Sequence, residues 1–492
     1  MVSALKRRSG VFGEGGLALI LLYCTVALIA LALVFVRVIS ERFAPGTSTI
    51  DHPYVAFVAV MMVAGLVWTG LIWLIPKILA IQKLRQNTHK ILWLCLGVGF
   101  VVRLLFLGST PIYENDWNRY LWDGAVVTHG ISPYSYSPAQ VLEVQVLEAA
   151  PQGDTNSLQT LALLSAENDG FADRINYQDL TTIYPPVAQS VFALAALIKP
   201  FDLNVLRILF IIIDAVSVWL MVKALRLYGR DPLWAVLYVL NPLVVYAGFN
   251  AVHMDIILVP FLLLCLLWIK ARPQWAAVAL GFAAAVKVWP LLLAPILFRT
   301  VRGNMGLYLR CAAIVTLVFL FLSAPILLTL GDNSGLSTYA QSWQRSSFLF
   351  PLLVFGLEST GVDTADQMAR IIVAVAVSGL SLWLGFARKG TPKTLPAALM
   401  VVTLALFLLA PTGYPWYGIW FVIYLPFVPS YCAAFLLSSL ALYYTRYAFW
   451  EADQYHIYSQ IIIPLQFGPP IVLILIVLYK YFRKPARSIE HA

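Results

Sequence analysis

Residues 91–108 read ILWLCLGVGFVVRLLFLG, and residues 113–124, a few positions later, read YENDWNRYLWDG. The first stretch is apolar and long enough to cross a bilayer, which takes about 17–25 residues. The second stretch holds three carboxylates and one arginine. Charged groups where a membrane helix meets water are costly to position and usually have a function. The two stretches therefore predict a membrane helix followed by a site for acid–base chemistry.

The composition of the whole chain predicts many membrane spans. The 492 residues are 61% hydrophobic and only 12% charged. The first apolar run, residues 17–36, is too long for a signal peptide and no small-residue cleavage site follows it, so we expect a retained span. The five cysteines lie inside apolar runs without CxxC spacing, which indicates packing residues. We expect an all-α polytopic membrane protein with about 12–14 transmembrane helices.

The distribution of charge predicts the orientation of these helices. Short loops rich in Lys and Arg face the cytoplasm. These segments are residues 6–8, 77–90, 223–230, 270–272, 299–310, 388–393 and 480–487. Residues 109–184 carry ten acidic residues against two arginines, so we expect them on the extracytoplasmic face of a bacterial inner membrane. If residues 184–199 crossed the membrane, every later basic loop would lie on the outside. We therefore expect the Pro-Pro pair to start an interfacial or half-inserted helix instead.

The same pattern divides the chain into three parts. Residues 1–90 hold two additional N-terminal transmembrane helices and a cytoplasmic loop. Residues 91–430 form a transmembrane core with a large outer loop at 109–204, and residues 431–492 hold the C-terminal helices and a cytoplasmic tail. No GxxxxGK[ST] or Rossmann fingerprint appears, and no cytoplasmic loop has room for a nucleotide-binding domain. An activated substrate would therefore arrive through the membrane, most simply as a lipid.

Four charged residues after the span at 91–108 are the first candidates for chemistry. Asp116 and Asp123 are seven residues apart, so they share one face if the segment is helical, with Arg119 between them and Glu114 just before. One interpretation is a general base with an organising cation. The other is a solvated helix start with local ion pairs.

A second polar tip holds His253 and Asp255, which is typical either of a helix cap or of a binding site. With Asp116 they form no tight ligand set, so we expect no cofactor, and a divalent metal held by these three residues is the less favoured alternative. Lys287 and Arg345 lie near predicted membrane edges, where a cation either reaches lipid headgroups or binds the phosphate of a lipid-linked donor.

Three charges lie deeper, within predicted spans, where each costs about 2.5–3.5 kcal/mol on insertion scales. They are Arg103, Arg207 and Asp214. Arg207 and Asp214 are too far apart along one helix to pair directly, so we expect them to bridge to other helices or to line a polar cavity.

The ordered motifs resemble those of GT-C-type glycosyltransferases, closest to the bacterial branch that depends on polyprenyl-phosphate mannose. The motifs that carry the resemblance are Asp116 with RYLWDG at 119–124, GISPY at 130–134, INY at 175–177, TIYPP at 182–186, Asn241-Pro242, His253-Met254-Asp255, Val286-Lys287, the loop around Trp343, and PTGYPWY at 411–417. The resemblance covers residues from about 90 to 425 and leaves the first 80 residues unexplained.

This resemblance implies an integral membrane enzyme that moves a hexose, with mannose favoured, from a polyprenyl-phosphate carrier to a lipid, glycan or cell-envelope acceptor. Asp116 would be the general base of an inverting displacement. The residues expected to bind substrate are Glu114, Arg119, Asp123, Tyr184, His253, Asp255, Lys287, Arg345, Tyr414 and Trp416. Membrane lipids are expected partners, and nucleic acid is not.

The chain departs from the branch at two places. It has Trp343-Gln344-Arg345-Ser346 where the branch often has Trp-Glu-Phe-Asn, and Tyr414 where the branch often has His. Because of these departures, the sequence does not determine the identity of the sugar. The alternative function is a polytopic lipid or oligosaccharide transporter or flippase, whose inverted repeats are not evident here.

Overall fold

The computed structural model describes residues 14–44, 52–147, 155–331, 334–386 and 394–483. Within these ranges every regular element is a helix, and an isolated β-bridge joins Arg345 to Thr412. The helices of seven residues or more are α2 Glu14–Ser40, α3 Tyr54–Thr69, α4 Leu71–Ala80, α6 Thr88–Leu105, α7 Asp116–Thr128, α8 Pro138–Leu147, α9 Thr155–Ala166, α10 Pro186–Ile198, α11 Leu203–Leu227, α14 Leu258–Trp268, α15 Pro273–Ala284, α17 Met305–Leu327, α18 Gly335–Ser342, α19 Leu349–Glu358, α20 Ala365–Phe386, α21 Leu395–Leu409, α23 Tyr431–Ser439, α24 Thr445–Glu451 and α26 Ile463–Arg483. The all-α polytopic class is confirmed.

Among the described residues, seven helices are long and apolar enough to cross a membrane. They are Gly15–Phe43, Tyr54–Ala80, Thr88–Leu105, Leu203–Leu227, Met305–Leu327, Ala365–Phe386 and Tyr455–Val477. The pair Pro232–Val239 and Pro242–Asn250, bent by 56°, would make an eighth span. The predicted twelve to fourteen crossings exceed this number, because other apolar segments form shorter helices of 10–17 residues. Proline accounts for several of these breaks, since it cannot donate a backbone hydrogen bond inside a helix.

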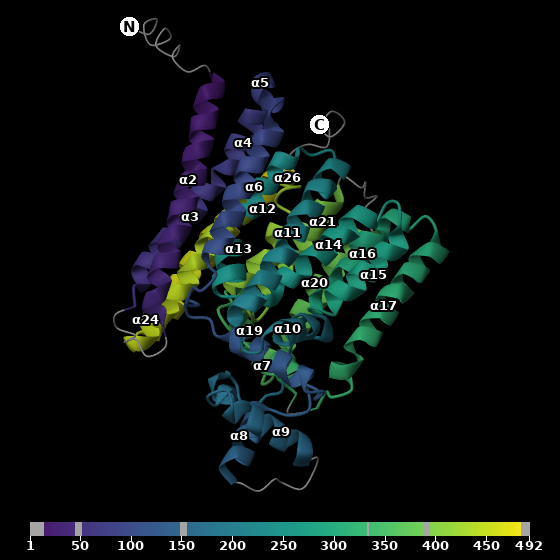
Figure 1. Ribbon diagram of the computed structural model, residues 1–492. Coiled ribbons are helices and arrows are strands. Elements are labelled where there is room, and N and C mark those ends of the chain that lie inside the picture. The colour runs from purple at the N-terminus through teal and green to yellow at the C-terminus, as the bar shows by residue number, and fades with distance from the viewer. Residues whose placement is uncertain (1–13, 45–51, 148–154, 332–333, 387–393, 484–492) are drawn as a thin grey trace, which may run out of the picture.

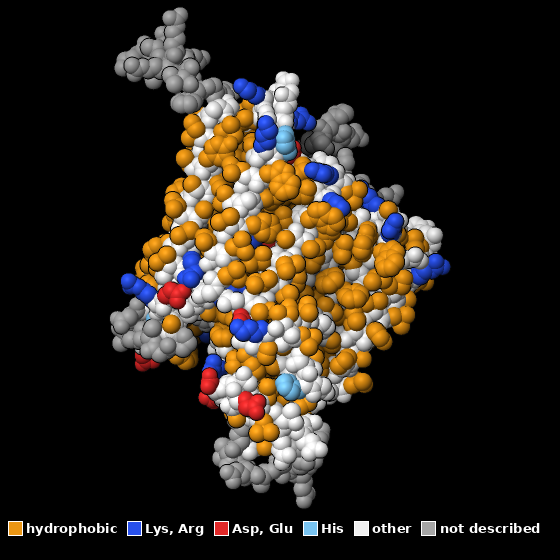
Figure 2. Space-filling view, viewed as in Figure 1, with side chains coloured by type: hydrophobic (Ala, Val, Ile, Leu, Met, Phe, Trp, Pro, Cys, Tyr) orange, Lys and Arg blue, Asp and Glu red, His pale blue; other side chains and the backbone are white. Residues whose placement is uncertain are grey.

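The helices form one elongated bundle, and α8 and α9 project from one end of it (Figure 1). Figure 2 shows an apolar belt around the middle of the visible face, with Lys and Arg gathered at the end that carries the short helix α5 Gln82–Arg85, and Asp and Glu mainly at the end of α8 and α9. This two-ended pattern agrees with the charge bias of the sequence. The basic segments 6–8 and 388–393 lie outside the described residues.

The charges inside the spans are matched by other groups. Arg103 of α6 and Asp214 of α11 form a fully buried ion pair at 2.7 Å, and the Tyr238 hydroxyl donates to Asp214 at 2.6 Å. Arg207 donates to the carbonyls of Ser109 at 2.7 Å and Phe249 at 2.9 Å. The expectation that these residues bridge to other segments is confirmed.

The end of the bundle that holds α7 is built by close helix packing. Helices α7 and α10 cross so closely that a Cβ on Gly124 would lie 2.3 Å from the Phe192 carbonyl oxygen. Helix α10 begins with Pro186 in its first turn, as the Pro-Pro pair predicts, and is 13 residues long. The Val187 amide donates to the Ala285 carbonyl at 3.1 Å, which ties α10 to the segment that carries Lys287.

Helix α3 packs against α23 and α24, so N-terminal and C-terminal parts of the described chain meet at one side of the bundle (Figure 1). Tyr113, just after the α6 span, stacks between Tyr54 of α3 and Tyr447 of α24, with ring centroids 4.9 and 4.2 Å away. The Tyr54 hydroxyl also hydrogen-bonds Glu451 of α24. The N-terminal helices thus contact the loop that leads into Asp116.

Candidate active site

Asp116 is the first residue of α7. The loop before it is hydrogen-bonded to the segment Tyr246–Asn250. The Ile112 amide donates to the Asn250 side chain at 2.9 Å, and the Tyr246 hydroxyl donates to the Ile112 carbonyl at 2.8 Å. Tyr246–Asn250 is a π-helix, a form that often occurs at functional sites. These hydrogen bonds bring the loop of Asp116 next to the tip that carries His253.

His253 lies between two carboxylates. Its Nδ1 is 3.8 Å from an oxygen of Asp116, and its Nε2 is 3.9 Å from an oxygen of Glu114. The ring is fully buried, and among the described residues neither ring nitrogen has a hydrogen-bond partner. Val252 just before it has a positive φ of 58°, which a β-branched residue rarely adopts. Backbone strain beside unpaired buried nitrogens is typical of a functional position.

Burial sets the protonation of this group. It raises the pKa of Asp116 to about 6, against the lowering effect of Lys287 and of a hydrogen bond from Tyr184. Burial and repulsion by Asp116 raise the pKa of Glu114 well above its usual value. Burial and nearby Lys287 hold the pKa of His253 well below its usual value. The side chain of Asp116 keeps 33% of its surface exposed, so it is the accessible carboxylate of the pair.

The predicted residues Asp255 and Lys287 pair with each other. Lys287 Nζ lies 2.7 Å from Asp255, whose same oxygen accepts from Trp420 Nε1 at 2.5 Å. The ammonium also lies over the Tyr417 and Trp420 rings, 4.2 and 5.0 Å from their centroids. Aromatic faces attract a desolvated cation, so Lys287 is held in place beside Asp116.

Arg119 and Asp123 lie in the buried layer beneath Asp116. Arg119 donates to the carbonyls of Asn176, Tyr177 and Leu180 at 3.1–3.3 Å. Asp123 is 1% exposed and accepts from Gln189 of α10 at 2.8 Å. These contacts hold the outer loop against α7 and α10, and they point both side chains toward protein groups.

Tyr184 connects that layer to Asp116. Its hydroxyl hydrogen-bonds the Asp116 carboxylate, and its carbonyl accepts from the Tyr134 hydroxyl at 2.9 Å. The hydrogen bond from Tyr184 favours the charged form of Asp116 and fixes its orientation.

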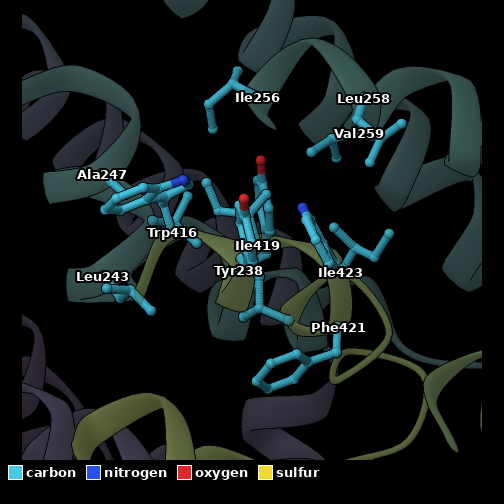
Figure 3. Close-up of a cluster of buried hydrophobic side chains, with 14 of the residues drawn as sticks. Tyr238, Leu243, Ala247, Ile256, Leu258, Val259, Trp416, Ile419, Phe421 and Ile423 are labelled. Atoms are coloured by element: carbon cyan, nitrogen blue, oxygen red, sulfur yellow. The ribbon is translucent and has the colours of Figure 1, made fainter. Parts of the chain in front are cut away.

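Tyr414, Trp416 and His253 form a continuous stack of rings. The centroids of Tyr414 and Trp416 are 4.3 Å apart and those of Trp416 and His253 are 3.8 Å apart, with interplanar angles of 10° and 11°. Figure 3 shows Trp416 at the edge of the buried core, beside Ala247 and Leu243. Both faces of the Trp416 ring are thus covered, and this aromatic wall of stacked rings holds His253 in place beside Asp116.

Arg345 lies at the other end of this wall. Its backbone amide donates to the Pro411 carbonyl at 3.0 Å, and the Gly413 amide donates to its carbonyl at 2.9 Å. The guanidinium hydrogen-bonds Tyr177. The neighbouring Trp343 donates to the Tyr414 hydroxyl at 3.1 Å. Arg345 therefore joins the site through the loop that carries the aromatic wall.

Two contributors were missed by the sequence interpretation. The first is Arg446, which lowers the pKa of Glu114. The sequence could have drawn attention to it, because it is the single Lys or Arg between residues 431 and 479. Trp420, which binds Asp255, lies within an apolar run and had no signal. Among the described residues, no group of three or more His, Cys, Asp or Glu is arranged to hold a metal ion.

Comparisons with known proteins point to one class. The family model for the N-terminal domain of alpha-(1->6)-mannopyranosyltransferases matches residues 174–302, which include Tyr184, His253 and Lys287. Alpha-(1->6)-mannopyranosyltransferase A of Mycobacterium tuberculosis is 25% identical over 337 residues, which cover 63% of this chain and 61% of that protein. No solved structure matches the chain. The chain is therefore similar to mannosyltransferases of this class over part of its length, and its apolar helices indicate a multi-pass membrane protein.

Proposed function

We propose that this protein is a mannosyltransferase that takes mannose from a polyprenyl-phosphate carrier and transfers it to a hydroxyl of a lipid, glycan or cell-envelope acceptor. The observation that carries the proposal is the accessible Asp116 carboxylate, which lies 3.8 Å from His253 beside a stacked aromatic wall. The absence of any nucleotide-binding signature in the sequence supports a lipid-linked donor.

The chemistry is an inverting displacement at the anomeric carbon. The acceptor hydroxyl attacks this carbon, the bond to the carrier phosphate breaks, and Asp116 takes the hydroxyl proton. Because burial raises its pKa to about 6, Asp116 is a stronger base than an ordinary aspartate and is still ionised at pH 7. The hydrogen bond from Tyr184 orients the carboxylate, neutral His253 lies 3.8 Å from it, and Lys287 favours its charged form.

We propose that the reaction takes place on the extracytoplasmic face. The acidic loop of residues 109–204 includes α8 and α9, which project from the same end of the bundle as α7 (Figure 1). The end with gathered Lys and Arg lies opposite, and the positive-inside bias favours the cytoplasm for it.

The test is Asp116→Asn in purified protein, with polyprenyl-phosphate mannose and membrane extract as substrates and mass spectrometry of products. Turnover should fall by about 10²–10⁴-fold, the usual contribution of a general base. Asp169→Asn, at a carboxylate whose side chain is 95% exposed on the same loop region, is the matched control and should keep wild-type turnover. Wild-type turnover of Asp116→Asn would place the base elsewhere.

The transporter or flippase alternative gains no specific support from the spans. Arg103 and Asp214, which would line a polar path, are fully buried and pair with each other. The same assay distinguishes the two functions. A mannosyltransferase forms product, whereas a transporter or flippase moves the donor across the membrane without forming product.

A further inference from the structure

Two arginines near the aromatic wall form no ion pair within the described residues, although Arg446 is near enough to Glu114 to lower the pKa of that carboxyl. Within the described residues, neither Arg345 nor Arg446 lies within 4.0 Å of a carboxylate oxygen, although both are only partly buried. Arg446 is held by a 2.6 Å hydrogen bond to the Tyr443 hydroxyl, and its guanidinium lies 5.1 Å from the ring centroids of Tyr443 and Tyr447. The other nitrogens of these guanidinium groups are available to a ligand.

The two arginines flank the same aromatic residue. The Arg345 loop is paired with the loop that carries Tyr414, and the Tyr414 ring lies 6.1 Å from the Tyr443 ring, over which Arg446 lies. Arg446 is also close enough to Arg345 to disfavour its charge. Two guanidinium groups near each other form a strong site for a phosphate, which accepts their planar pairs of donors.

An apolar groove ends at this site. A cavity of about 270 Å³ lies between α20 and α21, and Val373, Ala374, Val377 and Leu406 line it. At one end it is bounded by Pro411, whose carbonyl accepts the Arg345 amide.

Arg370 also borders the groove but is already engaged. Its Nε donates to Asp366 at 2.7 Å, and its Nη1 donates to the carbonyls of Ala340 and Trp343. The groove is therefore a mainly apolar cavity beside α20 that is joined to the Arg345 loop at Pro411.

We propose that the prenyl chain of the donor lies in the groove between α20 and α21, and that Arg345 and Arg446 together hold its phosphate. The inference rests on the proposed function, because it assumes a polyprenyl-phosphate donor. It assigns Lys287 to a different role: its charge is matched by Asp255, so it serves the reacting centre beside Asp116 and leaves phosphate binding to the arginines.

Equilibrium binding of polyprenyl phosphate and of the uncharged polyprenol to the full-length protein tests the phosphate site. Arg345→Gln and Arg446→Gln should each weaken polyprenyl-phosphate binding about tenfold, and the double variant about a hundredfold, down to the level of polyprenol. Arg174→Gln, a half-exposed arginine of the outer loop, is the matched control and should bind as wild type. If Arg446→Gln lowers the thermal stability of the protein, polyprenyl-phosphate binding by Arg345→Gln alone tests the site.

The outcomes separate this inference from the proposed function. If wild type binds the phosphate and the alcohol equally, the carrier assumed for the function is wrong. If wild type prefers the phosphate and the double variant keeps that preference, the two-arginine site is wrong. Competition by phosphatidylglycerol as strong as by polyprenyl phosphate would also overturn it, because the site would then recognise any lipid phosphate.

The groove is tested by filling it. Ala374→Trp places a large ring in the groove, whereas Ala376→Trp places the same ring on an exposed position of α20 outside its lining. Ala374→Trp should weaken binding of a long-chain polyprenyl phosphate about tenfold and weaken binding of a two-isoprene phosphate less, because the short chain buries less apolar surface in the groove. Ala376→Trp should change neither. Equal binding of the long chain by both variants would overturn the groove assignment.

Discussion

The Arg103–Asp214 pair and the Asp116–His253–Glu114 group are both charged clusters enclosed by apolar helices, but they use their polar atoms differently. Arg103 and Asp214 meet at 2.7 Å and take further hydrogen bonds from or to Tyr238, Gly99 and Val239. The second group keeps its ions 3.8–3.9 Å from a histidine whose nitrogens have no partner in the described structure. We expect the first arrangement to stabilise the fold, and we propose that the second, in which Asp116 keeps 33% of its side chain exposed, acts on a substrate.

The largest effect on stability is expected at the first cluster. Arg103→Leu leaves the Asp214 carboxylate buried without its cation and should lower the free energy of unfolding by about 3–5 kcal/mol. Denaturation followed by circular dichroism in detergent measures it. The double variant Arg103→Leu with Asp214→Leu should recover most of the loss, because both charges are then absent. A single variant as stable as wild type would show that the pair does not support the fold.

His253→Phe applies the opposite test to the second cluster. The new ring can stack on Trp416 as the imidazole does, and it removes two unpaired buried nitrogens, so stability should be unchanged or slightly raised. Turnover should fall by about 10–100-fold, because Asp116 loses its neighbour at 3.8 Å. If the variant lowers the free energy of unfolding while turnover is kept, the histidine supports the fold, as Arg103 and Asp214 are expected to do.

The pH dependence of turnover reports Asp116 directly. The base must be ionised, and burial raises its pKa to about 6, so kcat/KM should fall about tenfold per pH unit below that value and level off above it. Binding of polyprenyl phosphate over the same range separates ionisation of the enzyme from that of the donor. A profile that stays flat down to pH 5 would mean that Asp116 titrates as an ordinary aspartate or is not the base.

Tyr54→Phe should have the smallest effect. It keeps the stack on Tyr113 but removes the hydrogen bond from Tyr54 to Glu451, a loss of about 1 kcal/mol in unfolding free energy. Tyr54→Ala also removes the stack, so it should lower turnover as well as stability. Equal turnover of the Phe and Ala variants would show that the N-terminal helices do not influence the pocket.

Local rules predicted several of these features. The Pro-Pro pair predicted α10. The sequence left open whether the segment after the α6 span is helical, and in the structure α7 begins with Asp116. The three polar tips at Asp116, His253 and Lys287 were expected on one face, and the structure brings them together.

Tertiary contacts decided the rest. Arg119 and Asp123 are charged residues in a motif, yet they contact backbone carbonyls and Gln189, because α7 and α10 approach at a glycine that the sequence pattern alone does not interpret. The number of spans stays a prediction, because several apolar segments form helices of 10–17 residues, shorter than the seven long apolar helices. Arg446 is separated from Arg345 by about a hundred residues, so only the fold reveals that it influences the charge of Arg345.

The three-ring stack of Tyr54, Tyr113 and Tyr447 has a consequence for any attempt to isolate or transplant this activity. Two of its rings come from outside residues 91–430, the part of the chain that carries most of the recognisable motifs. A minimal catalytic fragment cut at those limits would keep the motifs but lose both neighbours of Tyr113. Engineering that swaps specificity between related chains therefore has to carry α3 and α24 along as one unit with the acidic loop.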